Sequence, residues 1–509
     1  MKVDLLGLGM LGAIEKMLPA IKKHEGVDVD LAHLPAGDPK VYEMLNAADT
    51  IGLFQVESRA QMASLPRHAP KIFYDIVVQV AIIRPGPIVG GMVHPFFDRR
   101  QGKAPVEYPH PCLEPILKRT LGVPLFQEQL LRIAMVAAGF TGGEAEELRR
   151  AMGFKRSQER MGAIEERLRS GMAKNGITGP AQDQIVKSIT SFALYGFPES
   201  HAASFALIAY ASAWLKAHHP AAFTACLLNA WPMGFYHPAT IVKDIQRHGT
   251  PVLPIDVNHS GWDCTLALLP SKKSSLAVRL GMRFIKGLKQ ATGEAIERER
   301  AGRFFEDVAD FSRRCQLRPE EMTLLAYAGA LSSLGLSRRE ALWQVAEVSR
   351  PLGPLYDTLP LSFSSRNSPL PEMSAVEETT ADYRATDLTA GPHLLEHLRP
   401  ALAARSILSA MELRSVPEGE RVKAAGAVIV RQRPGTAKGF VFLSLEDESG
   451  IVQAIVRPDL FKEHRAVIVG SEGLIVEGKL QKEGGNVSVR AERFWPLPAL
   501  PDLPSHDFR

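Results

Sequence analysis

The sequence predicts an α+β protein of several domains, mainly α-helical over most of its length and ending in a small β-barrel. Three observations support this prediction. The chain has 509 residues, which is enough for about three to five domains. Residues 1–225 and 279–345 repeat apolar side chains at three- and four-residue steps, as amphipathic helices do. From about residue 416 apolar and polar residues alternate, which is typical of β-strands.

Composition places the chain among ordinary globular proteins. Hydrophobic residues make up 45% and charged residues 23%, which excludes a fibrous or wholly disordered protein. The four cysteines lie far apart without a CxxC pair, which argues against a disulfide framework and a structural zinc site. Asp4 interrupts the apolar start and argues against a signal peptide. We therefore expect a cytoplasmic protein with no membrane partner.

Two helical stretches dominate the first part of the chain. Residues 122–154 have a helical pattern, with a turn expected at Gly142 and Gly143. Residues 201–230 are apolar and rich in alanine, with an interruption expected at Pro220. Residues 230–270 are expected to form loops and short strands. The first helical region is thus expected to give way to irregular structure near residue 230.

The second helical region contains a hairpin-like turn. Residues 285–288 precede a helix-like stretch, and Gly287 permits the tight turn of a helix-hairpin-helix, in which helix-start amides approach a phosphate. Lys289 stands where a second glycine of such a hairpin is expected. Residues 350–376 are rich in proline and serine, which is linker composition. The sequence therefore predicts a second helical domain, joined by a linker to the C-terminal strands.

Five strand candidates follow, at residues 422–430, 439–447, 450–456, 473–480 and 486–494. Five strands in so short a stretch fit a Greek-key barrel of the OB type, which commonly binds single-stranded nucleic acid. Residues 421–497 carry 12 Lys and Arg against 9 Asp and Glu. The alternative is a barrel that serves only packing or protein contact.

The most basic stretch of the chain is residues 149–174. It holds eight Lys and Arg and three acids, a local net charge of +5, whereas the whole chain has a net charge of only +4. Basic residues at helical spacing can neutralise the phosphates of a nucleotide or of a nucleic acid. The alternative is a solvated helix face.

Aromatic residues cluster just before the Ala-rich helix. Tyr195, Phe197 and His201 surround a Gly-Phe-Pro turn, and such residues suit stacking on a base. Core packing of the aromatic rings and a structural role for His201 are the alternatives. Asp4 ends a predicted short strand, which is a common position for a metal ligand, although two-metal phosphoryl transfer needs several carboxylates.

Six segments resemble, in order and spacing, the bacterial family C DNA polymerases, which comprise the polymerase III alpha subunits and their error-prone relatives. These segments are KVDLLGLG (2–9), GLFQVESRAQM (52–62), AIIRPGP (81–87), GVPLFQEQL (122–130), LRRAMG (148–153) and YGFPESHAASFA (195–206). Within the family the chain looks like the error-prone branch. Pro198 and Glu199 stand where replicative members usually carry Asn-Lys, and residues 233–249 look typical of that branch.

The resemblance implies roles around an incoming nucleotide. Asp4 would be the third catalytic aspartate of the palm and a ligand of the Mg²⁺ pair. Lys2 would contact the triphosphate, and Arg149 and Arg150 would hold its phosphates. Tyr195 would line the nucleotide pocket.

The remaining roles follow from the same resemblance. Phe197 and His201 would support Tyr195 in the nucleotide pocket. Contact with DNA is expected from five residues of the fingers and the hairpin, namely Arg84, Lys155, Arg156, Lys286 and Gly287.

The resemblance also implies a domain layout. It predicts the last, incomplete strand of the palm (1–10), the fingers (11–270), a helix-hairpin-helix region (271–349), a linker with short helices (350–415), an OB-fold domain (416–500) and a tail (501–509). The PHP domain, the thumb and most of the palm, with the first two catalytic aspartates, would precede this part. We expect the chain by itself to be inactive.

The implied function is DNA-directed DNA synthesis of the error-prone, damage-induced translesion type. Primer-template DNA and deoxynucleoside triphosphates are the implied substrates. Accessory mutagenesis proteins, and through them a sliding clamp, are the implied partners. The alternatives are a DNA-binding or interaction module without catalysis and a fragment of a replicative alpha subunit.

Overall fold

The computed structural model describes residues 7–84, 93–153, 158–192, 197–269, 276–348, 368–483, 485–497 and 506–508. Lys2, Asp4, Lys155, Arg156 and Tyr195 lie outside these ranges. The chain forms two compact units. The first unit is built mainly from Asp30–Ala217, and the second unit from Leu8–Val29 with most of the chain after His218.

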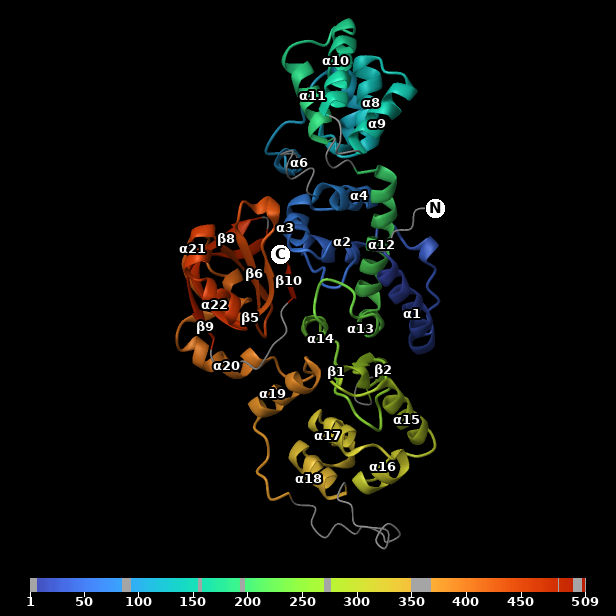
Figure 1. The fold of residues 1–509 in the computed structure, drawn as a ribbon, viewed down its shortest axis with the longest axis vertical. Helices are drawn as coiled ribbons and strands as arrows, with labels where there is room; N and C mark the ends of the chain where they lie inside the picture. Colours follow the sequence, from blue (N-terminus) through green and yellow to red (C-terminus); the bar gives the residue numbers. More distant parts are fainter. Residues whose placement is uncertain are drawn as a thin grey trace. The chain divides into compact units, whose positions relative to one another are not determined.

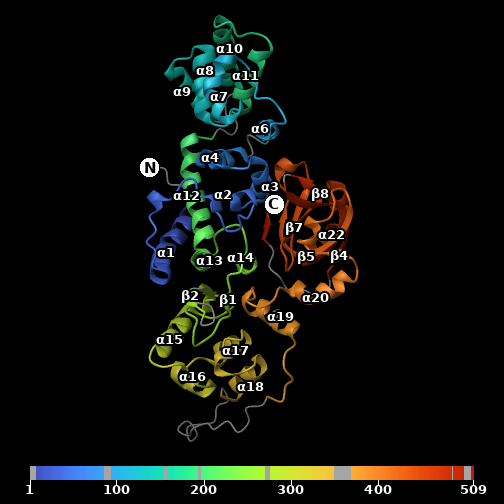
Figure 2. The ribbon, with the colours of Figure 1, turned by 180° about the vertical axis from the view of Figure 1, so that it is seen from behind.

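The first unit is helical, as predicted. In Figures 1 and 2, α8, α9, α10 and α11 pack together as one bundle. Local caps explain where several helices begin: the Asp38 carboxylate accepts the backbone N–H groups of Lys40 and Val41, and Ser58 caps α3. The helices are α2 (Pro39–Asn46), α3 (Arg59–His68), α4 (Phe73–Ile82), α6 (Val93–Arg100), α7 (Glu114–Leu117), α8 (Gln127–Ala138), α9 (Gly142–Gly153), α10 (Gln158–Lys174), α11 (Pro180–Phe192) and α12 (Glu199–His218).

The predicted turn at Gly142 and Gly143 was wrong by a few residues. The chain turns at residues 139–141, where Gly139 has a φ of 69° and ends α8, and both predicted glycines belong to α9. Thr141 and Glu144 exchange hydrogen bonds across the first turn of α9, which fixes the start of that helix. The left-handed conformation at Gly139 therefore breaks the helical stretch.

The interruption predicted at Pro220 is confirmed, whereas the loop predicted before residue 250 is wrong. Pro220 is the first residue of α13 (Pro220–Asn229), a position that needs no backbone N–H donor. The segment that follows forms α14 (Pro238–Arg247), because the His237 side chain accepts the Ala239 N–H and Pro238 occupies the first turn. Apolar residues on one face of α14 are buried.

The second unit combines helices with two sheets. A small sheet has the strand order β1-β3-β2, with β1 (Val252–Leu253), β2 (Thr265–Leu268) and β3 (Leu276–Arg279). Two of its helices, α19 and α20, lie within the segment 350–415, which was predicted to be a linker with short helices. Besides α13 and α14, the helices are α1 (Leu8–Glu25), α15 (Gln290–Arg300), α16 (Val308–Cys315), α17 (Pro319–Tyr327), α18 (Arg338–Val348), α19 (Ala375–Thr386), α20 (Leu394–Ala403), α21 (Pro458–Glu463) and α22 (Arg465–Gly470).

The predicted C-terminal barrel is confirmed. Its strands pair in the order β5-β6-β7-β9-β8, and β8 pairs back onto β5, which closes a five-stranded barrel of the OB type. Two short strands, β4 (Ile407–Leu408) and β10 (His506–Phe508), add to β5 outside the ring. The barrel strands are β5 (Arg421–Gln432), β6 (Val441–Glu446), β7 (Ile451–Val456), β8 (Gly473–Glu483) and β9 (Asn486–Pro496).

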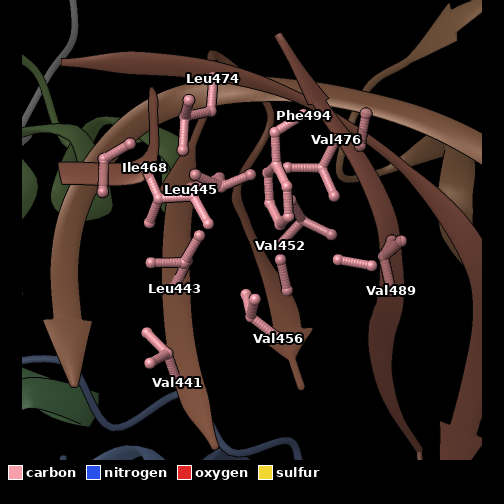
Figure 3. Close-up of a cluster of buried hydrophobic side chains, with 14 of the residues drawn as sticks. Val441, Leu443, Leu445, Val452, Val456, Ile468, Leu474, Val476, Val489 and Phe494 are labelled. Atoms are coloured by element: carbon pink, nitrogen blue, oxygen red, sulfur yellow. The ribbon is translucent and has the colours of Figure 1, made fainter. Parts of the chain in front are cut away.

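Side chains from alternate positions of these strands fill the barrel, and Ile468 of α22 adds to them (Figure 3). Phe494 points into this core while its neighbour Trp495 is 38% exposed, as the alternation of a strand requires. The fold is therefore mainly helical with a C-terminal OB barrel, as the sequence predicts. Among the described residues, no helix is both long enough and apolar enough to cross a membrane.

Candidate nucleotide and nucleic-acid interface

Two predicted site residues meet at the end of α4. Arg84 follows this almost entirely buried helix, and its Nε donates to the carbonyl oxygen of Val80 at 3.1 Å. The guanidinium carbon of Arg84 lies 3.7 Å from the centroid of the Phe197 ring. A cation on the face of an aromatic ring is attracted by the ring's quadrupole. Residues 113 positions apart in sequence thus form one surface element.

Phe197 begins a row of contacting rings that continues into α12. Its centroid lies 4.9 Å from that of His201, which lies 4.2 Å from that of Phe205. Phe205 in turn meets Phe54 edge to face at 5.1 Å. The step of four residues places His201 and Phe205 on one face of α12, and Phe197 lies just before the start of this helix. Phe205 and Phe54 are buried, whereas Phe197 and His201 are half-buried, so the stack runs from the core to the surface.

Glu199 anchors the start of α12. Its backbone N–H donates to the Glu128 carboxylate at 2.8 Å, and its own carboxylate accepts from the Tyr74 hydroxyl at 2.9 Å. Arg119 lies 3.5 Å from the same carboxylate and stacks on the Tyr74 ring at 3.6 Å. Burial, followed by the hydrogen bond to Glu199, raises the pKa of Tyr74, so the phenol stays protonated as a donor.

Sequence reasoning missed Tyr74, Arg119 and Glu128 as partners of Glu199. They lie 71 to 125 residues away from Glu199 along the chain, so no local spacing rule brings them together. The unusual Pro198-Glu199 pair was the available signal. In the structure this glutamate fixes the turn that carries Phe197.

Arg149 and Arg150 lie on α9 and share one acidic partner. Arg149 binds both carboxylate oxygens of Glu146, at 2.8 and 2.6 Å, and Arg150 lies 3.4 Å from the same group. The pKa of Glu146 is lowered to about 2, mainly by the hydrogen bond from Arg149 and further by Arg150. Arg149 and Arg150, the two predicted phosphate ligands, therefore share one carboxylate, which compensates part of their positive charge.

Two further arginines of the basic segment, Arg167 and Arg169, are also paired. Arg167 contacts Glu144 and Glu147, and Arg169 contacts Glu165 and Asp183. Several of these acids lie outside residues 149–174. Between residues 144 and 183 the sequence contains eight basic and seven acidic residues, a net charge of +1. The net charge of +5 within residues 149–174 therefore overstates the positive charge of this part of the chain.

The hairpin glycine occupies a position that requires it. Gly287 has a φ of +80°, and a Cβ added there would lie 3.4 Å from the Leu324 side chain. Lys286 next to it is engaged within the second unit: its N–H donates to Ala385 O at 2.9 Å and its ammonium lies 2.6 Å from Asp387. The hairpin turn forms, and Lys286 ties it to α19. A DNA contact by Lys286 and Gly287 stays a prediction.

The barrel presents one aromatic ring to solvent. The Lys423 ammonium lies 5.8 Å from the centroid of Trp495, on a surface that also carries Arg421. Arg421 forms ion pairs with Glu477 and Glu492. An exposed indole beside a lysine suits stacking on an unpaired base.

Three segments of the chain match known families. Residues 10–176 match the bacterial DNA polymerase III alpha subunit finger domain, residues 249–341 match a helix-hairpin-helix motif, and residues 417–497 match the OB-fold nucleic acid binding domain. The first matched segment contains Arg84, Arg149 and Arg150. The helix-hairpin-helix match begins before the predicted boundary at 271.

Curated relatives match almost the entire chain. The error-prone DNA polymerase of Anaeromyxobacter dehalogenans (strain 2CP-C) is 48% identical over 99% of this chain and 46% of its own length. The enzyme of the same name from Pseudomonas fluorescens (strain Pf-5) is 49% identical over 100% of this chain and 50% of its own length. The chain thus spans about half the length of the curated relatives it matches.

Among solved structures, asparaginyl-tRNA synthetase from Pyrococcus horikoshii matches 19% of this chain and 24% of its own, at 25% identity and a TM-score of 0.16. That TM-score is too low to indicate a common fold. The chain is therefore similar along its length to error-prone DNA polymerases, and it carries a polymerase III alpha finger segment, a helix-hairpin-helix and an OB fold.

Proposed function

We propose that this chain is part of a DNA-directed DNA polymerase of the error-prone, translesion type. It would supply the fingers, the helix-hairpin-helix and the OB domain of an enzyme that adds deoxynucleotides to a primer 3′ end. The observation that carries the proposal is the Arg84–Phe197–His201 element, in which a guanidinium lies over one ring and the two rings meet edge to face, in a chain 48% identical to error-prone DNA polymerases. Half-buried rings with a cation at their open end suit an unpaired base and a nearby phosphate.

The predicted site residues would have three roles, namely positioning of the nucleotide, compensation of charge and binding of metal. Arg84, Phe197 and His201, with Tyr195, would position the nucleotide and the adjacent template base. Arg149 and Arg150, with Lys2, would offset the negative charge that develops on the triphosphate during transfer. Asp4 would be one carboxylate ligand of the Mg²⁺ pair, which supplies charge stabilisation for phosphoryl transfer when bound.

Primer extension with Mg²⁺ tests the proposal. The 509-residue chain, which spans about half the length of the curated polymerases that it matches, is expected to give no extension alone. When joined to an upstream half that carries the other catalytic aspartates, it is expected to extend primers. Arg84→Ala and Phe197→Ala should then lower kcat/KM for the nucleotide about tenfold or more, since each removes a positioning contact. Wild-type kcat/KM in both variants would contradict the assignment.

A second candidate function is a DNA-binding module without catalysis. The helix-hairpin-helix and OB segments favour it, because neither motif needs a catalytic residue to bind DNA. Asp4→Ala separates the two functions. In the polymerase this substitution should abolish turnover and leave DNA affinity unchanged, whereas in a binding module it should change nothing measurable.

Accessory mutagenesis proteins would link such a polymerase to the sliding clamp. Co-purification of the whole polymerase with the clamp should therefore require a third protein. Direct capture of the clamp by the isolated chain would overturn the indirect route.

A further inference from the structure

A basic cavity lies at the C-terminal end of α3 in the first unit. It has a volume of about 510 Å³ and contains none of the residues of the Arg84–Phe197–His201 element. Four cationic side chains line it, and no Asp or Glu is among the described residues of the lining. The lining consists of Pro66, Arg67, His68, Ala69, Lys71, Arg99, Arg100, Gln101 and Leu121.

Three arginines of the cavity are held in fixed positions. Arg100 donates from Nε to His68 O at 2.9 Å and from Nη2 to the Asp75 carboxylate at 2.8 Å. Arg99 donates from Nη1 to Leu121 O at 2.7 Å. The Arg67 guanidinium lies 5.0 Å from the centroid of the Phe97 ring. Guanidinium groups fixed in this way need little further ordering when an anion binds.

Asp75 compensates one of the four cations, Arg100, and leaves the charge of the others. The Asp75 carboxylate already accepts from Arg100 and from the backbone N–H groups of Lys71 and Ile72, at 2.8 and 3.3 Å. His68 adds no charge, because burial lowers its pKa to about 4. The Lys71 side chain is exposed, and its ammonium has no partner among the described residues. Positive charge therefore remains at the mouth of the cavity.

We propose that this cavity binds a phosphate group. Guanidinium forks match phosphate oxygens in pairs, and a lysine adds a mobile point charge. The phosphate comes either from a nucleic-acid backbone or from a free polyphosphate chain such as that of a nucleotide. The nucleic-acid source rests on the proposed function, whereas the polyphosphate source does not.

Helix capping explains only part of the arrangement. Arg100 donates to the free carbonyl groups of His68 and Ala69 at the end of α3, which is a structural role. Lys71 has no such role, since its ammonium caps no helix among the described residues. Substitution of Lys71 can therefore test ligand binding without removing a side-chain contact that stabilises the fold.

The experiment compares Lys71→Glu with a matched control, Lys40→Glu. Lys40 is an exposed lysine on α2 of the same unit, away from the cavity lining. Inorganic tripolyphosphate and a fluorescein-labelled single-stranded dT 20-mer are titrated separately into the intact chain at 0.15 M salt. Lys71→Glu is expected to weaken binding of at least one probe about tenfold, and Lys40→Glu to change it less than twofold.

The two probes identify the source of the phosphate. Loss confined to tripolyphosphate assigns a free polyphosphate, and loss confined to the 20-mer assigns a backbone phosphate. Loss of both, with tripolyphosphate displacing the 20-mer, assigns one site open to either source. Equal behaviour of Lys71→Glu and Lys40→Glu with both probes overturns the proposal.

Absence of 20-mer binding in the wild type counts against the proposed function and leaves the tripolyphosphate result decisive for the cavity. A Lys71→Gln variant with an unchanged unfolding midpoint guards against misfolding.

Discussion

At the scale of the residue, His68 shows how a buried polar group makes stability depend on pH. The ring is fully buried, and its Nδ1 contacts Gln79 Oε1 at 2.8 Å. Gln79 in turn donates to Gln61 and to the Ser64 hydroxyl. Burial lowers the pKa of His68 to about 4, and the hydrogen bond to Gln79 opposes that shift only in part. The folded protein therefore holds His68 neutral.

We predict that His68 makes the first unit less stable in acid. The unfolded chain binds the proton near pH 6.5 and the folded chain only near pH 4, so stability falls as the pH drops through this window. The free energy of unfolding should fall by about 2 kcal/mol between pH 7 and pH 5 on account of this residue. Urea unfolding of wild type and His68→Gln measures the difference.

The exposed His94 provides the control for this experiment. His94→Gln should keep the full pH dependence of the wild type, whereas His68→Gln should flatten it. An unchanged pH dependence in His68→Gln would show that another group is responsible.

Glu146 restrains two arginines that are proposed to hold phosphates. Replacing it by glutamine removes the bidentate partner of Arg149 and the charge beside Arg150. We predict that Glu146→Gln raises affinity for single-stranded DNA about two- to fivefold, because exposed ion pairs contribute little and their charges are easily redirected. Fluorescence anisotropy at two salt concentrations checks this. A lower affinity would mean that Glu146 serves to orient the arginines.

At the scale of the element, the barrel depends on close approach of its strands. A Cβ at Gly478 of β8 would overlap the carbonyl oxygen of Arg490 on β9. We predict that Gly478→Ala destabilises the barrel by about 1–3 kcal/mol, since the strands must move apart. Gly470→Ala is the control, because a Cβ there meets no atom within 4 Å. Chemical unfolding of both variants decides the matter, and equal stability would contradict the prediction.

The predicted helical stretch at residues 122–154 shows why elements are easier to predict than their limits. Apolar periodicity identified both helices, α8 and α9. The turn lies at Gly139 because that glycine, unlike Gly142 and Gly143, adopts a left-handed conformation, and Thr141 then caps the next helix. Gly142 and Gly143 look like a turn in sequence, yet their amides belong to the first turn of α9.

At the scale of the whole molecule, charge is almost balanced. The net charge is +4, and four arginines of the basic segment, Arg149, Arg150, Arg167 and Arg169, form ion pairs with acids that flank the segment. We predict a shallow salt dependence of single-stranded DNA binding. Eight phosphate contacts from the basic segment would give a slope of log K against log salt of about −5.6, and the chain should show a smaller value. A slope of −5.6 or steeper would mean that the ion pairs open when DNA binds.

The sequence by itself determined the main helical regions, the closed C-terminal barrel and the interruption at Pro220. These features depend on local periodicity and on turn chemistry, which a linear pattern contains. It also brought forward Arg84, Phe197 and His201 as candidate site residues, although no pattern stated that Arg84 would lie on the Phe197 ring.

Only the tertiary structure decided which charges are compensated and which rings meet. Glu199 forms hydrogen bonds with Tyr74 and Glu128, which lie on distant helices. Asp183 on α11 forms an ion pair with Arg169 on α10. The cavity beside Lys71 likewise gathers residues from α3, α6 and three loops. The physical reason is that ion pairs, stacking and cavities depend on separations of a few ångströms in space, which separation along the chain does not fix.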